Sequence, residues 1–359
     1  MYLFLRPAAP VFQRDAAADA RFARAVLTRA PPLGSLAQAY APAPLEQQWA
    51  GGAREYAARE GGYCGVMAGE EKTWQTWLDA VSATRSAALG GTAGTGSSGG
   101  SSSSSGSGSG SGMEWSTLSY SDGSRVALEP LAGILRDPRT TCQASRLTPP
   151  VVWDTQDSKA LVHLDPAFYR ALAATLAQPG QAPSARPRAY LFDIGSTQWA
   201  SRPFSGLSWL VHAYAELGIA FSDVLAWEAR GKPARDYFLD MPVELAARTH
   251  FYNVPVVAGV AAEGPGAVLR MLKALARPED LVVFKLDIDM DTLEEEITLN
   301  ILESEELSAL VDDFYFEHHV VTHGAMDAPW GKEHPRDTAD SIALFQALRR
   351  RGIRAHSWP

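Results

Sequence analysis

The fold class is decided within residues 189–302, which read AYLFDIG (189–195), SGLSWLVHAYAEL (205–217), SDVLAWEA (222–229), DLVVFKLDID (280–289) and DTLEEEITLNIL (291–302). Short apolar runs rich in β-branched and aromatic residues alternate with longer runs whose apolar residues recur at helical spacing. Such alternation indicates βαβ units, because parallel neighbours need a crossover connection, usually a helix. The sequence therefore predicts an α/β protein with a doubly wound, mostly parallel sheet.

The same alternation continues to the C-terminus, and glycines and acids mark where the helices begin and end. The later runs are FYNVPVV (251–257), PGAVLRMLKALA (265–276), DFYFEHHV (313–320), DSIALFQALRR (340–350) and GIRAHSWP (352–359). Gly218 and Gly352 each follow a helical run, at the position where a residue with positive φ ends a helix. Asp291, with Glu294 three residues later, predicts a capping box for the helix that follows. These boundaries support the segmentation without reference to the apolar counts.

A run of almost pure glycine, serine and threonine over residues 90–112 predicts a flexible linker, because it cannot bury enough apolar surface to offset the entropy of ordering. Upstream, residues 1–89 predict a small helical N-terminal appendage, with helical spacing at 15–27 and 70–89. Whether this appendage stands alone or packs on the main domain stays open, because a flexible insert can also lie within a surface loop. Residues 113–359 form the predicted main domain.

The main domain is expected to begin with a β-hairpin and to have its core in residues 188–359. The hairpin covers Thr117 to Leu128, with Asp122-Gly123 as its turn. Residues 129–138 predict a brief helix that Pro138 stops.

Composition restricts the partners of this chain. A net charge of −9 and a pI near 5.4 give no global attraction to phosphate backbones, so we expect no nucleic-acid partner. No apolar run reaches the roughly 18 residues that span a bilayer, so we expect no membrane span and a soluble chain, cytoplasmic rather than secreted. Cys64 and Cys142 are too few for a disulfide framework or a thiolate zinc site, although a single bridge stays open. The sequence does not indicate an oligomeric state.

Polar residues stand at the carboxyl ends of the predicted strands, where doubly wound sheets bind their ligands. An acid and a glycine after the first strand, followed by an acid after the second, is the order used to hold a ribose and its neighbouring groups. In this order the stretch around Asp193 and Gly195, with Glu228, resembles the cofactor motifs of class I S-adenosylmethionine (SAM) dependent methyltransferases. The resemblance implies that SAM is the cofactor. The cofactor contacts that it implies are Asp193, Gly195, Ser196, Glu228 and Asn253.

A second group of polar residues follows the strand at 280–289 and the strand after it. Lys285, Asp287 and Asp289, with Glu317 further on, resemble the FkbM-like methyltransferases, in which a Lys-x-Asp-x-acid strand precedes a strand that carries Glu. This resemblance covers about residues 188–358 and implies a Rossmann-type methyltransferase fold. It also implies O-methylation of a small-molecule or glycan hydroxyl.

The mechanism implied by the resemblance is transfer of the sulfonium methyl group to an acceptor oxygen, which needs alignment and a general base. The expected catalytic residues are Asp289, Asp287, Lys285 and His318, with Asp289 as the first candidate for the base and His319 as a further one. Lys285 is expected to orient a carboxylate or the acceptor, or to form an ion pair that only holds two strands together. This interpretation assigns no metal ligand.

The chain departs from the family pattern at three places. Ser196-Thr197-Gln198-Trp199 replaces the glycine-rich continuation after Gly195, and Trp199 is bulky enough to narrow the pocket. Met290 stands where the family has a glycine, and the stretch from Asp193 to Glu228 exceeds the roughly 20 residues usual in such units. SAM binding is therefore expected from fold analogy more than from motif.

Three other functions stay open. A divalent metal site could use Glu317, His318, His319 and His323 with Asp287 and Asp289, although on a strand His318 and His319 would point to opposite faces. Asp287-Ile288-Asp289 also matches the DxD motif with which glycosyltransferases hold Mn²⁺ against a nucleotide-sugar diphosphate. The third alternative is a non-catalytic scaffold or binding domain in which Trp199 fills the pocket, and cofactor binding distinguishes it from the enzyme.

Overall fold

The computed structural model describes residues 15–27, 37–80 except 74 and 78, 114–133, 135, 142, 162–177, 186–199, 206–321 and 335–358. The predicted linker at 90–112 and His323 lie outside the described residues. Every helix within these ranges is too short or too polar to cross a membrane.

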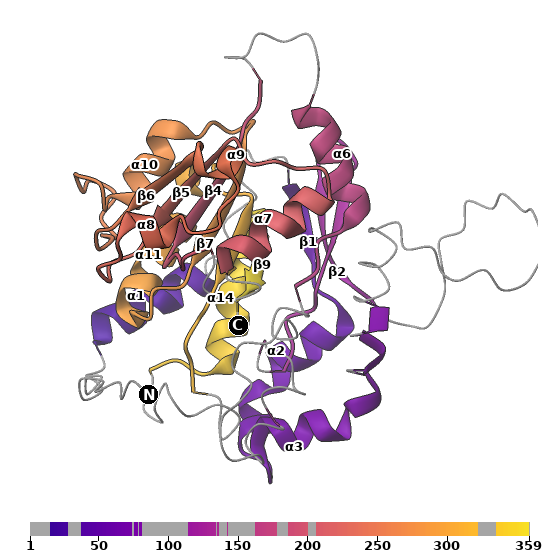
Figure 1. Ribbon diagram of the computed structural model, residues 1–359. Helices are drawn as coiled ribbons and strands as arrows, with labels where there is room; N and C mark the ends of the chain where they lie inside the picture. The colour runs from indigo at the N-terminus through magenta and orange to yellow at the C-terminus, as the bar shows by residue number, and fades with distance from the viewer. Residues whose placement is uncertain are drawn as a thin grey trace, which may run out of the picture.

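A six-stranded sheet in which every pair of neighbours is parallel forms the centre of the main domain (Figure 1). Its strands are β4 (Ala189–Ile194), β5 (Asp223–Trp227), β6 (Thr249–Tyr252), β7 (Leu281–Leu286), β8 (Asp313–Phe316) and β9 (Arg354–Ser357). They lie in the order β6-β5-β4-β7-β8-β9. The predicted parallel α/β architecture is confirmed, and this order is compatible with a Rossmann-like fold. The order reverses between β4 and β7, where such folds open a crevice at the carboxyl ends of the strands.

Helices cover both faces of the sheet, as the doubly wound prediction requires. One buried apolar cluster takes residues from α6 (Pro166–Leu176), α7 (Gly206–Glu216), α8 (Ala234–Tyr237) and α9 (Val243–Ala246). The other takes residues from α1 (Ala16–Leu27), α2 (Pro44–Ala57), α3 (Gly62–Gly69), α10 (Val268–Leu275), α11 (Asp291–Glu303), α12 (Glu305–Ser308) and α14 (Thr338–Arg350). Helix α1 lies beside α11 and α14 (Figure 1).

Aromatic side chains stack across five strands on one face of the sheet. The ring pairs Tyr252–Trp227, Trp227–Phe192, Phe192–Phe284 and Phe284–Phe314 have centroids 5.0, 5.9, 5.8 and 5.7 Å apart, with planes tilted by no more than 25°. These rings come from the apolar runs that predicted the strands, and each strand contributes alternate residues to the face. Cross-strand ring contacts stabilise the register that brings the strand ends together.

The residues upstream of the linker take part in structure formed by residues downstream of it. Strand β1 (Ala37–Ala41) pairs antiparallel with β2 (Ser116–Tyr120), which pairs with β3 (Arg125–Leu128). The predicted hairpin is confirmed, with Gly123 at φ 84° in its turn. Helix α2 packs against α14, and a disulfide joins Cys64 in α3 to Cys142. A separate N-terminal appendage is therefore not confirmed. Disulfides persist mainly in oxidising compartments, so the Cys64–Cys142 bridge does not support the predicted cytoplasmic location, which stays untested.

The predicted helix ends are partly right. Gly218 and Gly352 have φ values of 85° and 91°, as expected for residues that end helices. The capping box at the start of α11 is wrong: the N-cap is Met290, and Glu294 turns back to accept a hydrogen bond from the backbone N–H of Ile288 at 2.7 Å. The brief helix at 129–138 is also wrong in its described part, since residues 129–133 are not helical.

Candidate functional site

The ends of β4 and β5 lie side by side and form the edge at which the sequence predicted a cofactor. Asp193 pairs with Ala226 and Ile194 with Trp227 in the parallel register. Beyond the strand, the backbone N–H groups of Gly195 and Ser196 donate to the carbonyl of Trp227, at 3.0 and 2.7 Å. Gly195 and Glu228 are thus neighbours at the carboxyl edge of the sheet.

Gly195 is required by a close approach between β4 and β7. Its φ of 83° lies in the left-handed region, and a Cβ built on it would overlap with the carbonyl oxygen of Asp287. The sequence predicts that this glycine contacts a cofactor. In the structure its first role is to let the backbone after β4 run against the end of β7.

Asp193 and Ser196 hold the loop that follows β4. Asp193 is completely buried and accepts a hydrogen bond from the Ser196 hydroxyl at 2.6 Å. The Ser196 oxygen also lies 2.9 Å from the Tyr237 hydroxyl of α8. Both residues were predicted to contact the cofactor, and in the structure both are completely buried.

Lys285 joins the ends of β4 and β7 through three acceptors. Its ammonium group donates to the carbonyl of Gly195 at 2.9 Å and lies 3.2 Å from Asp193 Oδ1 and 3.0 Å from Asp287 Oδ2. Burial alone lowers the pKa of Lys285, but the two carboxylates outweigh it and raise the pKa above its ordinary value. An ammonium has three protons, and three acceptors surround it. The arrangement fits both the expected ion pair between two strands and the orienting of a carboxylate, and it leaves no proton of Lys285 for an acceptor molecule.

Glu228 directly follows β5 at the carboxyl edge of the sheet, and residues of its own loop hold its carboxylate. One carboxylate oxygen accepts from the backbone N–H of Arg230 at 2.7 Å, and the other lies 3.3 Å from the Lys232 ammonium. Asn253 pins the same loop, because its side-chain amide donates to the carbonyls of Glu228 and Arg230 and accepts from the N–H of Lys232. The Glu228 side chain keeps 13% of its surface exposed.

The predicted catalytic acids meet at the ends of β7 and β8. The Glu317 N–H donates to the carbonyl of Leu286 at 3.1 Å, which puts Glu317 next to Asp287. Burial raises the pKa of Asp287 to about 7, with the Glu317 carboxyl adding to the effect and Lys285 opposing it. Asp289 has a φ of 58°, unusual for a residue with a side chain, and its carboxylate lies 3.2 Å from a guanidinium nitrogen of Arg230.

His319, and not His318, belongs to this acidic cluster. Strand β8 ends at Phe316, so the strand alternation assumed for the two histidines does not apply. The His318 ring stacks on Phe316, and its Nδ1 lies 3.0 Å from the Ser341 hydroxyl. The His319 ring lies between two carboxylates, with Nδ1 against Asp291 and Nε2 3.6 Å from Glu317.

Electrostatics in the cluster follow from burial and from crowded carboxyl groups. Burial lowers the pKa of His319, but its hydrogen bonds to Asp291 and Glu317 outweigh this and raise the pKa to about 10. Burial raises the pKa of Glu294 to about 8, although His319 and the Ile288 N–H oppose the shift. Sequence reasoning missed Asp291 and Glu294 as site residues, because their spacing was read as a helix cap.

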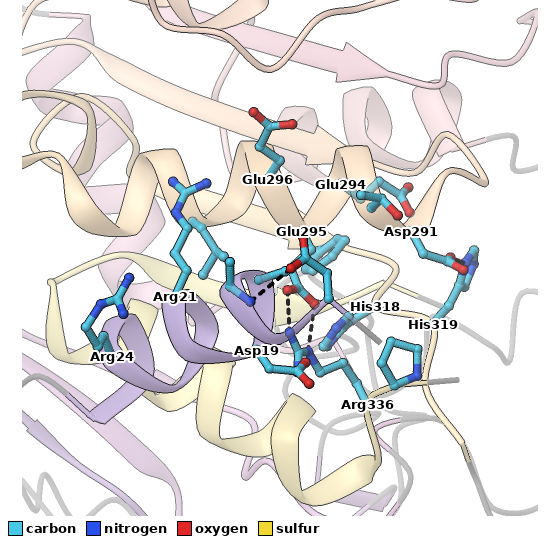
Figure 2. Close-up of a pocket in the computed structure, with 17 residues that line it drawn as sticks. Asp19, Arg21, Arg24, Asp291, Glu294, Glu295, Glu296, His318, His319 and Arg336 are labelled. Atoms are coloured by element: carbon cyan, nitrogen blue, oxygen red, sulfur yellow. Dashed lines mark hydrogen bonds and ion pairs between the residues drawn. The ribbon is translucent and has the colours of Figure 1, made fainter. Parts of the chain in front are cut away.

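A pocket of about 550 Å³ opens beside the cluster. Its lining includes Asp291, Glu294 and His319 on one side and residues of α1 on the other (Figure 2). Arg336 bridges the two sides, with ion pairs to Glu295 at 2.7 Å and Asp19 at 2.8 Å. The N-terminal helix therefore forms part of the wall of this pocket.

Trp199, expected to narrow the cofactor pocket, packs towards α7. Its indole lies 5.6 Å from the His212 ring, and it joins the apolar cluster that contains Tyr237. Its backbone N–H donates to the carbonyl of Tyr237 at 3.4 Å. These contacts hold the loop after Gly195 against α7 and α8.

In comparisons with known proteins, no family model, no curated protein and no solved structure matches this chain. The resemblance to FkbM-like methyltransferases therefore remains a hypothesis based on the sequence.

Proposed function

We propose that this protein is a SAM-dependent methyltransferase that methylates a hydroxyl group of a small molecule or sugar. The observation that carries the proposal is the pairing of β4 with β5, which puts Gly195 beside Glu228 at the carboxyl edge of the sheet, one strand from the reversal of strand order between β4 and β7. The acids of β7 and β8 lie at the next strand ends, on the side where an acceptor would meet the cofactor.

The residues present fit an adenosine cofactor at Glu228. Its carboxylate is fixed by a backbone N–H and is partly exposed at the end of β5, where ribose hydroxyls could donate to it. The Lys232 ammonium lies 3.3 Å from the second oxygen, and this long, flexible side chain can move away at little cost. Asn253 keeps the loop in place while it does so.

When bound, SAM supplies a methyl group on a sulfonium sulfur. The chain must align an acceptor oxygen with that methyl and receive the hydroxyl proton as the O–CH₃ bond forms and the S–CH₃ bond breaks. Asp289 is the proposed base, because its carboxylate is 44% exposed at the end of β7. Asp287 and Lys285 are positioning residues that fix this strand end against β4.

The pocket between α1 and the cluster is the proposed acceptor site, and the base Asp289 lies outside its lining but within 4.8 Å of His319, which is part of it. Its carboxylates, together with Arg21, Arg24 and Arg336, offer both acceptors and donors to a polyhydroxyl molecule. Its walls come from the main domain and from α1, so the N-terminal residues take part in acceptor binding in this proposal.

Calorimetry with SAM and S-adenosylhomocysteine on the full chain tests the proposal. We expect saturable binding of both, and we expect Glu228→Ala to weaken it about 10- to 100-fold, since charge-assisted hydrogen bonds to the ribose are lost. Glu244→Ala, which changes an exposed acid of α9, is the control and should leave the affinity unchanged. Absence of heat for both ligands at millimolar concentration would contradict the proposal and favour a non-catalytic scaffold.

A further inference from the structure

We infer that Asp289, Glu317 and His319 form a binding site for a divalent cation of the Mn²⁺ type, next to the pocket beside α1, whose lining includes His319. Their potential ligand atoms all lie within 4.8 Å of one another. Ligands around a cation with bonds of about 2.1 Å are about 3 to 4 Å apart, so small movements of the side chains complete the site. The cation site does not depend on the proposed methyl transfer.

His319 is already oriented as a metal ligand. Its Nδ1 is bonded to the Asp291 carboxylate, and its Nε2 faces the Glu317 side of the cluster. Ligand histidines usually donate their other ring N–H to a carboxylate, which fixes the tautomer and the ring orientation. Asp291 supplies that contact from the first turn of α11.

A buried carboxyl group in the same cluster has an oxygen without a hydrogen-bond partner among the described residues. Glu294 is 1% exposed, and one of its oxygens accepts from the Ile288 N–H. Its other oxygen makes no hydrogen bond within the described part of the chain, and the carboxylate lies within 4.8 Å of the ligand atoms of Asp291 and His319. An isolated buried carboxylate is costly, so the cluster gains stability from a cation placed next to it.

Apart from His319, the basic side chains nearest the cluster, Lys285 and Arg230, add little positive charge to it. Lys285 is directed to Gly195, Asp193 and Asp287, on the β4 side. Arg230 pairs with Asp289 but is 75% exposed, so its contact is weak and easily replaced. The acids of β8 and α11 therefore keep an excess of negative charge around one imidazole.

The backbone at Asp289 also indicates a functional constraint. Its φ of 58° costs free energy in a residue with a side chain, and glycine would adopt it without strain. A carboxylate kept at a strained position, within reach of Glu317 and His319, is expected when that carboxylate has a ligand to hold.

The donor set selects the class of cation. Two carboxylates and one imidazole suit Mn²⁺ better than the all-oxygen preference of Ca²⁺ or the thiolate preference of structural zinc. Three protein ligands leave coordination positions for water or for substrate oxygens, and the Asp289 side chain is 44% exposed. If the proposed function is right, the cation would hold the acceptor hydroxyl and ease loss of its proton.

Electron paramagnetic resonance of Mn²⁺ on the EDTA-treated and desalted full chain tests the site. We expect one saturable site, weakened about 100-fold or more by Glu317→Gln or Asp289→Gly and about 10- to 100-fold by Asp291→Asn. Asp289→Gly removes the carboxylate but accepts the backbone φ, so it should remain folded in a thermal melt. Glu263→Gln, at an exposed acid on the surface, is the control and should bind as the wild type does.

The imidazole gives an independent signature. Nitrogen modulation from one histidine is expected in the pulsed spectrum of bound Mn²⁺, lost in His319→Gln and retained in the neighbouring His318→Gln. Absence of saturable binding, unchanged affinity in Asp289→Gly and Glu317→Gln, or modulation that survives His319→Gln would each overturn the inference. The Mn²⁺ experiments contain no SAM, and the SAM calorimetry is run in EDTA. The cation site and the SAM site are therefore tested separately, and a negative result for one does not affect the other.

Discussion

Replacing Gly195 by alanine is expected to lower the free energy of unfolding by about 2 to 4 kcal/mol and to abolish SAM binding. The new methyl group would meet the carbonyl oxygen of Asp287, which is backbone and cannot rotate away. The residue must also keep a φ of 83°, which an L side chain disfavours. Relief of both requires the ends of β4 and β7 to separate, and Lys285 loses its shared acceptors when they do.

Gly264 provides a matched control for this substitution. Its φ is 86°, nearly the same as that of Gly195, but nothing lies within 4 Å of the position of an added Cβ. Gly264→Ala therefore measures the backbone cost alone, about 1 kcal/mol. Urea unfolding followed by circular dichroism gives both values, and equal losses in the two variants would show that β4 and β7 do not approach as closely as described.

The second large effect is expected at Arg349, which is completely buried in α14. Its guanidinium donates to Glu129 at 3.0 Å and to the carbonyl of Ala355 at 3.0 Å, and it lies 3.3 Å from Glu46. Arg349→Met keeps an unbranched apolar stem but removes the guanidinium, so Glu46 loses its cation and Glu129 keeps the His356 ring nitrogen, at 2.9 Å, as its one basic side-chain partner among the described residues. We expect a loss of about 3 to 5 kcal/mol, the usual result of removing one partner of a buried ion pair.

Glu46 links this network to the N-terminal residues, since it lies in α2 and also accepts from Ser116 at 2.6 Å and Gln346 at 2.9 Å. Glu46→Gln in the Arg349→Met background should recover part of the loss, because it removes one uncompensated charge. Arg350→Met, at the exposed neighbour, should change stability by less than about 0.5 kcal/mol. A melting temperature of Arg349→Met equal to that of Arg350→Met would contradict the account of this network.

The central sheet could be predicted from sequence because buried parallel strands are short, nearly continuous apolar runs. The ends of those runs also located the candidate site, since Asp193 lies next to the last residue of β4, and Glu228 and Asp287 directly follow β5 and β7. Local periodicity and the rule that ligands bind at carboxyl ends of strands were sufficient for this much.

Features that depend on distant residues had no local signal. The pairing of β1 with β2 joins segments on either side of the Gly/Ser run, and Arg349 meets Glu46 across 303 positions of sequence. Asp291 and Glu294 have the spacing of a capping box, so a local rule explained them before their contacts with His319 and Ile288 were known. His319 could not be preferred to His318, because the choice depends on β8 ending at Phe316.

Hydrogen exchange with and without S-adenosylhomocysteine tests the central claim most directly, because it reports where the ligand binds. We predict slower exchange in peptides that contain Gly195–Ser196 and Glu228–Arg230, the loops at the ends of β4 and β5. Unchanged exchange in both peptides at saturating ligand, or protection confined to other parts of the chain, would contradict the assignment of this edge as the cofactor site.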